Sequence, residues 1–293
     1  MTSNRYQKRD VPIQEIIDRV QVGDPDLLPE ILLSISPCRS GTTALLRVFG
    51  ASGIQSHYQE LKNILRWRMQ GREISWQIPK NIEILYLKET LGPYTQTEAL
   101  FNPLEVLLKA GLPDHKLRIF IVGREPLQTW ASWFSWWHAV TNVDIFIQAF
   151  QTTAQIYQQA VREGFEVGSF VYEAFREYGT STAIRHLLES LGVTYHPAAI
   201  QEWRSLADFG SRASNVVFPN EPPEFEVPNL HASIENANEL KYLGRDQDIR
   251  QLDPDDVEKI KDSGVQEIYQ EWEQDCYQKL GLDQLRFKIG NNL

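Results

Sequence analysis

The chain has 293 residues, of which 42% are hydrophobic, and this is enough to bury one large core. Its formal net charge of -10 argues against a nucleic-acid backbone as partner, because such binding depends on clustered lysine and arginine. Only two cysteines occur, so we expect neither a disulfide framework nor a metal cluster built on cysteines.

The spacing of apolar residues predicts helices that alternate with strands. In chain order we expect a short helix within 12–22, a strand at 31–35, a helix over 42–50, a strand at 117–122, a helix over 146–161 and one or two helices over 253–280. This alternation predicts a single α/β domain, 1–293, with a central, mainly parallel sheet flanked by helices.

Two regions lie outside this alternation. Residues 1–27 form an N-terminal extension, and its first ten residues are polar and charged. The stretch 208–240 holds four prolines among polar residues and predicts a long loop, so we interpret 208–245 as a lid or an acceptor-binding loop. Since the chain has no apolar run of the roughly 20 residues that span a bilayer, we expect a soluble, cytoplasmic protein without a membrane span.

The most informative motif follows the first predicted strand, where residues 36–43 read S-P-C-R-S-G-T-T. A Walker A loop reads G-x-x-x-x-G-K-[ST], and in the same frame Thr42 stands where the lysine belongs. A strand that enters a helix through such a loop directs backbone N–H groups and the helix dipole at an anion. Gly41 permits close approach, and the hydroxyls of Ser40, Thr42 and Thr43 can bind phosphate oxygens. The alternative is a helix start rich in capping residues.

The stretch R-S-G-T-T-A-L at 39–45 resembles the 5'-phosphosulfate loop, [KR]-[ST]-G-T-[TS]-x-L, of sulfotransferases that use 3'-phosphoadenosine 5'-phosphosulfate. A second stretch resembles the 3'-phosphate site of the same family: Arg124 ends a predicted strand, and Ser132 follows eight residues later in the next helix. Tyr172, in F-V-Y-E at 170–173, matches a tyrosine that lies near the adenine in this family. The resemblance covers about residues 28–195 and implies a P-loop nucleotide-binding-like fold.

Sulfonyl transfer needs positive charge at the leaving phosphate and a base for the acceptor proton. The resemblance places Arg39 at the 5'-phosphate, and Lys88, at the end of a strand, near the sulfonate. The histidine that serves as base in the cytosolic animal members is replaced by threonine in this chain. Our candidates for the base are therefore Glu60, then His57, then Glu89. Each of these also has a structural interpretation, as an ion-pair partner or a surface residue.

A cluster of aromatic residues follows Arg124. Trp130, Trp133 and Trp137 fall on one helical face, which predicts a helix packed on the sheet. Alternatively, Trp136, Trp137 and His138 line an acceptor pocket, which would favour a bulky or apolar acceptor.

The sequence thus predicts a metal-independent sulfotransferase that acts on a hydroxyl, or less readily an amine, of a small-molecule or lipid-like acceptor. Its product would be adenosine 3',5'-bisphosphate. A P-loop kinase-like enzyme and a catalytically silent nucleotide-binding protein remain as alternatives, and no oligomeric state follows from the sequence.

Overall fold

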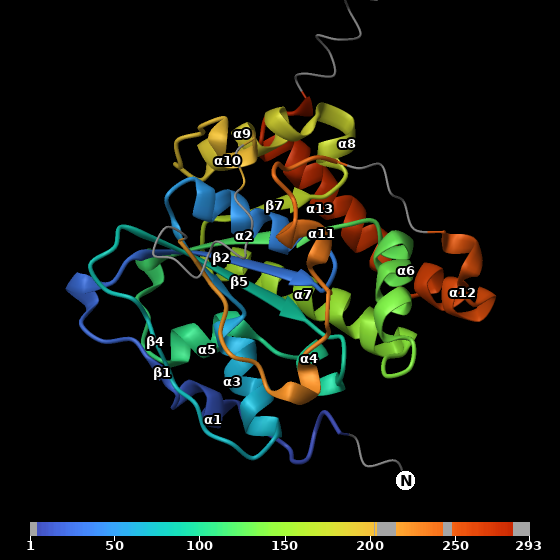
Figure 1. Ribbon diagram of the computed structural model, residues 1–293, viewed down its shortest axis with the longest axis horizontal. Helices are drawn as coiled ribbons and strands as arrows, with labels where there is room; N and C mark the ends of the chain where they lie inside the picture. Colours follow the sequence, from blue (N-terminus) through green and yellow to red (C-terminus); the bar gives the residue numbers. More distant parts are fainter. Residues whose placement is uncertain (1–4, 202, 204–214, 243–247, 284–293) are drawn as a thin grey trace, which may run out of the picture.

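A computed structural model of the protein describes residues 5–201, 203, 215–242 and 248–283. Its centre is a parallel sheet of six strands in the order β7-β6-β2-β5-β3-β8 (Figure 1). In chain order the strands are β2 (Glu30–Pro37), β3 (Gln55–Tyr58), β5 (Ile84–Leu91), β6 (Leu117–Gly123), β7 (Val167–Val171) and β8 (Val216–Val217). The predicted α/β class with a central parallel sheet is confirmed.

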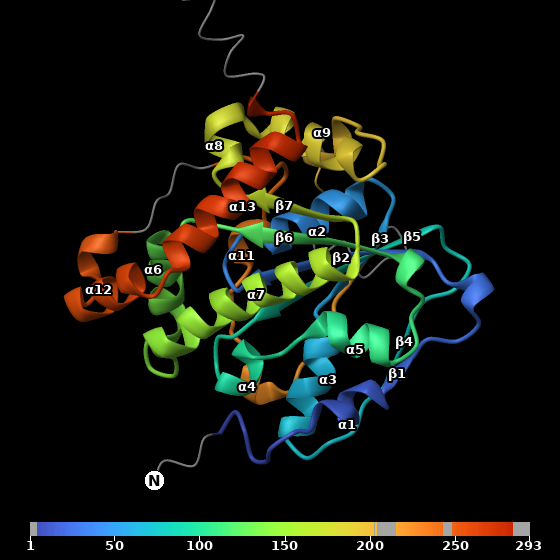
Figure 2. The ribbon, with the colours of Figure 1, turned by 180° about the vertical axis from the view of Figure 1, so that it is seen from behind.

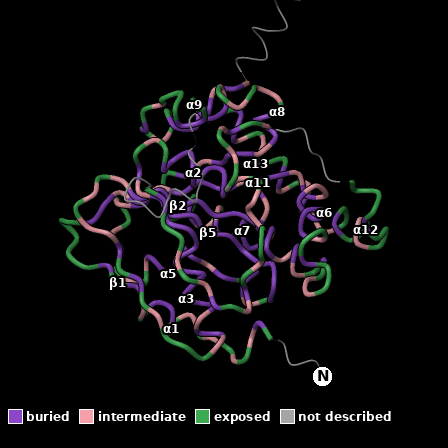
Figure 3. Tube along the Cα trace, viewed as in Figure 1, coloured by how far each residue is buried: buried purple, intermediate pink, exposed green. Residues whose placement is uncertain are grey.

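Helices cover both faces of the sheet. On one face lie α7 (Val143–Glu163) and α13 (Val265–Lys279), which are in front of the strands in Figure 2. On the other face lies α2 (Thr42–Ala51), which packs against β3 and β5. The central strands are buried along their length while the outer helices and loops carry the exposed residues (Figure 3). Such two-sided burial explains why these strands read as continuous apolar runs.

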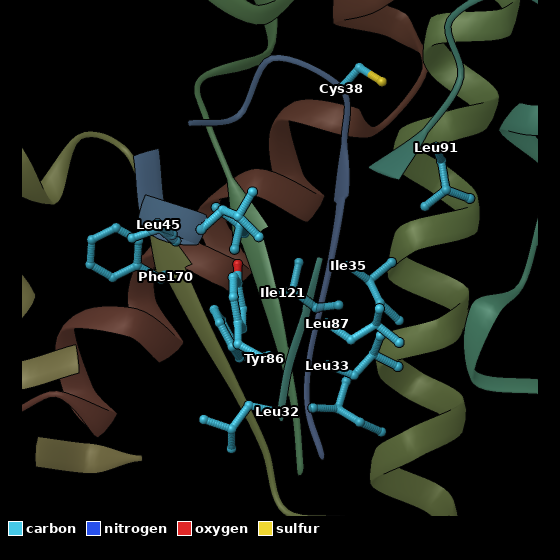
Figure 4. Packing of buried hydrophobic residues seen from close by; sticks show 14 of the residues in the cluster. Leu32, Leu33, Ile35, Cys38, Leu45, Tyr86, Leu87, Leu91, Ile121 and Phe170 are labelled. Carbon is cyan, nitrogen blue, oxygen red and sulfur yellow. The ribbon is translucent and has the colours of Figure 1, made fainter. Parts of the chain in front are cut away.

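The alternation of side chains along β2 and β5 builds the two halves of the core (Figure 4). Leu33, Ile35 and Leu87 point toward α7, whereas Leu32 and Tyr86 point to the opposite face, where α2 lies. All five residues are fully buried. One register therefore fixes both faces, since a slip by one residue would exchange them.

The remaining helices follow local sequence signals. Pro126 opens α6 (Pro126–Trp137), where Glu125 caps the Gln128 amide at 2.7 Å, and Asn142 caps the start of α7. The other helices of more than one turn, with their bounds, are α1 (Ile13–Ile17), α3 (Glu60–Met69), α5 (Pro103–Lys109), α8 (Ala174–Tyr178), α9 (Thr180–Ser190) and α12 (Pro254–Asp262). Of the described residues, no helix combines the length and apolar character needed to cross a membrane.

Two predictions from the sequence differ from the structure. The helix expected within 12–22 ends at Ile17, and Val20–Gln21 instead forms β1, which pairs in parallel with β4 (Trp76–Gln77). The loop expected over 208–240 contains β8 and the short helix α11 (Ala232–Glu235) in its described part. β8 forms because the free edge of β3 offers it a backbone partner, a long-range effect that the local proline content does not reveal. Residues 208–214 and 243–245 of the expected lid lie outside the described residues.

Candidate functional site

The candidate site is a cavity of about 190 Å³ at the carboxyl ends of the sheet strands. Because β2, β3, β5, β6 and β7 are parallel, their carboxyl ends meet at one edge, which is where α/β folds place their ligands. In Figure 1 the arrowheads of β2 and β5 point at the orange segment that leads to α11, and residues of this segment form the opposite wall.

The loop between β2 and α2 forms the floor of the cavity. Gly41, the N-cap of α2, has a φ of 89°, and no side chain caps the helix among the described residues. The first N–H groups of a helix have no partner one turn earlier, and within the described residues those of Thr42 and Thr43 are available at the cavity. The Ala44 N–H instead donates to the Gly41 carbonyl at 3.0 Å. Ser40 donates its hydroxyl to the Pro37 carbonyl at 2.9 Å and so braces the loop. This geometry suits an anion, although phosphate binding itself remains a prediction.

Tyr172 makes glycine necessary at position 41. A Cβ atom added to Gly41 would lie 2.9 Å from Cδ2 of the Tyr172 ring. The same ring lies against Arg124, whose guanidinium carbon is 4.9 Å from the ring centroid. Gly41 therefore meets two demands at once, the left-handed backbone and the close approach of an aromatic ring.

We expect Gly41→Ala to destabilise the fold by about 2–3 kcal/mol, because it combines backbone strain with a steric clash. Gly53→Ala is the matched control, since Gly53 has a φ of 88° but nothing within 4 Å of the added Cβ. The control should cost only the backbone strain, about 1 kcal/mol. Urea denaturation measures both values, and equal losses would show that the Tyr172 contact does not constrain the loop.

Four cations line the cavity, and Arg66 is paired with Glu98 and Glu221. The other three are Arg39 from the loop, Lys88 from β5 and Arg124 from the end of β6. Lys88 and Arg124 are buried and Arg39 is partly buried, and within the described part of the chain none of these three forms an ion pair. Burial and the charge of Arg124 lower the pKa of Arg39, and burial lowers the pKa of Lys88 to about 7. Cations that are removed from water without a carboxylate partner are costly unless an anion binds beside them.

The contacts of these cations are weak substitutes for ion pairs. The Nζ atom of Lys88 lies 3.8 Å from the centre of the Tyr58 ring, its neighbour across the β3–β5 register. The Nε–H of Arg124 is buried and has no hydrogen-bond acceptor among the described residues. An orphaned guanidinium donor of this kind points to an anionic ligand.

The structure also joins two residues that the sequence assigned to different ends of a nucleotide. Arg39 donates its Nε–H to the Ser132 hydroxyl of α6 at 3.0 Å and an Nη1–H to the Leu230 carbonyl at 3.3 Å. Ser132 therefore holds Arg39 in this conformation, and it does not itself line the cavity. Arg39 also lies 5.7 Å from the centre of the exposed Trp136 ring.

None of the three candidate bases lines the cavity. His57 and Glu60 bind each other, with 2.8 Å between Nδ1 and Oε1, and both side chains are buried. Glu89 accepts the backbone N–H groups of Leu61 and Lys62 at 2.9 and 3.2 Å, so its carboxylate caps α3. Burial raises the pKa of Glu89 to about 8. These residues have structural partners, and direct contact with a ligand in the cavity would require them to reorient.

His231 is the residue that the sequence analysis missed. It lines the cavity from the segment before α11, and its Nε2 atom lies 3.0 Å from the Tyr58 hydroxyl. Burial, together with the positive charges of Lys88 and Arg39, lowers the pKa of His231 to about 3. At neutral pH its imidazole is therefore uncharged. A single histidine in a proline-rich loop carries no local signal of this role.

The tryptophans of α6 were expected either to pack on the sheet or to line an acceptor pocket, and the structure shows some in the core and others elsewhere. Trp130 and Trp133 are buried in the core, as predicted for a helix packed on the sheet. Trp137 is also buried but lines the cavity, whereas Trp136 and His138 are exposed at the surface. The acceptor-pocket interpretation therefore applies to Trp137 alone.

The candidate site thus combines a helix N-terminus, three cations without carboxylate partners, and an uncharged histidine around one cavity. The sequence matches no protein-family model, and it has no significant match among curated proteins. The function of the site is therefore inferred from the residues that line the cavity.

Proposed function

We propose that the protein transfers a sulfonyl group from 3'-phosphoadenosine 5'-phosphosulfate to a hydroxyl, or less readily an amine, of a small-molecule acceptor. The observation that carries this proposal is the convergence of Arg39, Lys88 and Arg124 on one cavity. A donor with phosphate at both ends of its adenosine would supply the negative charge that these cations lack. The orphaned Nε–H of Arg124 and the close fit of Gly41 against Tyr172 agree with such a ligand.

In this proposal the loop and α2 bind the 5'-phosphosulfate end through backbone N–H groups and the hydroxyls of Thr42 and Thr43. Arg124 binds the 3'-phosphate, since a guanidinium presents a planar set of donors to phosphate oxygens. Arg39 needs only to exchange the Ser132 hydroxyl or the Leu230 carbonyl for a phosphate oxygen. Tyr172 would contact the adenine side of the nucleotide, next to Arg124.

Transfer forms a bond between the acceptor oxygen and sulfur and breaks the bond between sulfur and the bridging oxygen of the 5'-phosphate. Arg39 and Lys88 stabilise the charge that grows on that oxygen, and loss of one such donor typically costs about 3 kcal/mol of transition-state stabilisation. We assign the acceptor proton to His231, because it is the imidazole that lines the cavity near both cations. Burial is the main cause of the low pKa of His231, and a bound anion raises this pKa by offsetting the smaller contribution of Lys88 and Arg39.

Two titrations and one assay test this proposal. Calorimetry should detect adenosine 3',5'-bisphosphate binding that is much tighter than the binding of Mg-ATP, because Thr42 occupies the place of the Walker lysine. Sulfonate transfer to a panel of phenols and alcohols should persist in the presence of a metal chelator. Tighter binding of Mg-ATP would favour a kinase-like enzyme, and nucleotide binding without any transfer would favour a catalytically silent protein.

The pKa of Lys88 predicts a pH dependence of nucleotide binding. The pKa of Lys88 in the ligand-free protein is about 7, so Lys88 loses its proton as the pH rises above this value. The neutral amine attracts a bound anion less strongly than the ammonium does. We expect the affinity for adenosine 3',5'-bisphosphate to fall by about tenfold between about pH 7 and about pH 8.5. Lys88→Arg keeps its charge over this range and is the control. If the affinity of the wild type changes with pH no more than that of Lys88→Arg, Lys88 does not contribute to the anion site.

A further inference from the structure

One end of the cavity is lined by aromatic side chains rather than by cations. Tyr94, Trp137 and Phe225 line it together with Pro93, and we call these four residues the aromatic end. The Tyr94 ring centre lies 5.9 Å from that of Trp137 and 5.3 Å from that of Phe225, and the Trp137 indole N–H donates to the Tyr94 hydroxyl at 3.1 Å. Flat rings packed edge to face leave walls that suit another flat ring.

A buried ion-pair network lies at the aromatic end. Arg66 donates its Nε–H to Glu98 at 2.7 Å and an Nη1–H to Glu221 at 2.8 Å. Its guanidinium carbon lies 5.4 Å from the Tyr94 ring centroid and 4.8 Å from that of Phe225, so Arg66 is fixed on all these sides. A guanidinium held in this way has little freedom to bind a further carboxylate.

The two carboxylates differ in how a ligand can reach them. Glu98 is fully buried, does not line the cavity, and also accepts the Tyr94 backbone N–H at 2.9 Å. Glu221 lines the cavity, and its side chain keeps 18% of its exposure. Glu221 pairs with Arg66, and Arg66 also pairs with Glu98. Arg66 also lines the cavity, but its side chain keeps only 5% of its exposure, so Glu221 is the more accessible partner of this pair for a ligand at the aromatic end.

The cavity thus holds both signs of charge: Arg39, Lys88 and Arg124 have no carboxylate partner, whereas Glu221, through Arg66, lies beside the aromatic end. We infer that the acceptor is a planar aromatic alcohol or phenol that carries an amine or a second hydroxyl away from the reacting oxygen, and that Glu221 accepts a hydrogen bond from this distal group. An acceptor with a distal carboxylate is disfavoured, because it would approach Glu221 with like charge. This inference rests on the proposed function for the identity of the aromatic end as the acceptor site.

Three phenols that differ in the group at the end of their side chain test the inference: tyramine, 4-ethylphenol and 3-(4-hydroxyphenyl)propionate. Calorimetric titration of the full chain without nucleotide should rank them in that order, with tyramine about tenfold or more tighter than the propionate. In Glu221→Gln the preference for tyramine over the propionate should fall to about threefold or less. Because these titrations need no turnover, their outcome is separate from that of the sulfonate-transfer assay.

Two further variants keep the test decisive. Glu224→Gln removes a carboxylate three residues away that pairs with Lys8 at 3.2 Å, and the preference for tyramine should persist. Glu221→Asp keeps the charge and should retain most of the preference, which excludes a general loss of folding as the cause. The inference is overturned if the wild type binds the propionate as tightly as tyramine, if none of the three phenols binds, or if Glu221→Gln keeps the full preference.

Discussion

Replacing Arg39 with alanine should lower turnover by about 10²–10³-fold, the loss expected when one preorganised donor to a developing anion is removed. The stability of the ligand-free fold should not fall with it. Arg39 is partly buried near Arg124 without a carboxylate partner, so its removal relieves charge repulsion and a desolvation penalty. For the same variant, assays should therefore show a lower turnover, and urea denaturation should show a free energy of unfolding that is unchanged or higher.

The control for Arg39→Ala is Arg118→Ala. Arg118 pairs with Glu30 at the edge of the sheet where β2 and β6 begin. The cavity lies at the other edge, where these strands end, and Arg118 does not line it. Its loss should leave turnover unchanged. Arg39→Lys restores the charge but not the planar fork, so we expect activity between that of the alanine variant and the wild type. Full activity of Arg39→Ala would contradict a role for this residue at the leaving group.

Replacing His231 with glutamine should lower kcat by about 10²–10⁴-fold, the usual contribution of a general base. The affinity for adenosine 3',5'-bisphosphate should stay within about twofold, because His231 is uncharged and adds no attraction for an anion. The glutamine keeps a polar group near the Tyr58 hydroxyl. The acid limb of the pH–rate profile, which reports protonation of the base, should disappear in the variant.

The same assay separates His231 from the bases that the sequence suggested. Glu60→Gln and His57→Gln break a buried pair, so they should lower stability by about 1–3 kcal/mol and change kcat less than His231→Gln. If Glu60→Gln abolishes turnover with nucleotide binding intact while His231→Gln does not, the base is Glu60. This result would also imply that Glu60 leaves His57 during the reaction.

The sequence predicted the two units that hold Arg39 and Arg124 because their signals are local. The apolar run of β2, the positive φ that Gly41 supplies and the start of α2 lie within about twenty consecutive residues. β6 and α6 likewise follow each other directly, with Pro126 at the start of the helix. Strand, turn and helix periods act over such distances, so the strand-to-helix transitions and the parallel sheet could be read from the residues. The resemblance to sulfotransferases rests on the same short stretches.

Only the tertiary structure decided which side chains face the cavity. Leu230, 191 residues after Arg39, accepts its hydrogen bond, and His231 and Glu221 enter the wall from the same distant segment. The pairing of His57 with Glu60, and the capping of α3 by Glu89, depend on side-chain direction at the ends of β3 and β5. Long-range packing sets these contacts, and no local period encodes it. The sequence alone thus determined the loop and helix start that form the floor of the cavity, whereas packing determined which side chains, His231 and Glu221 among them, form its walls.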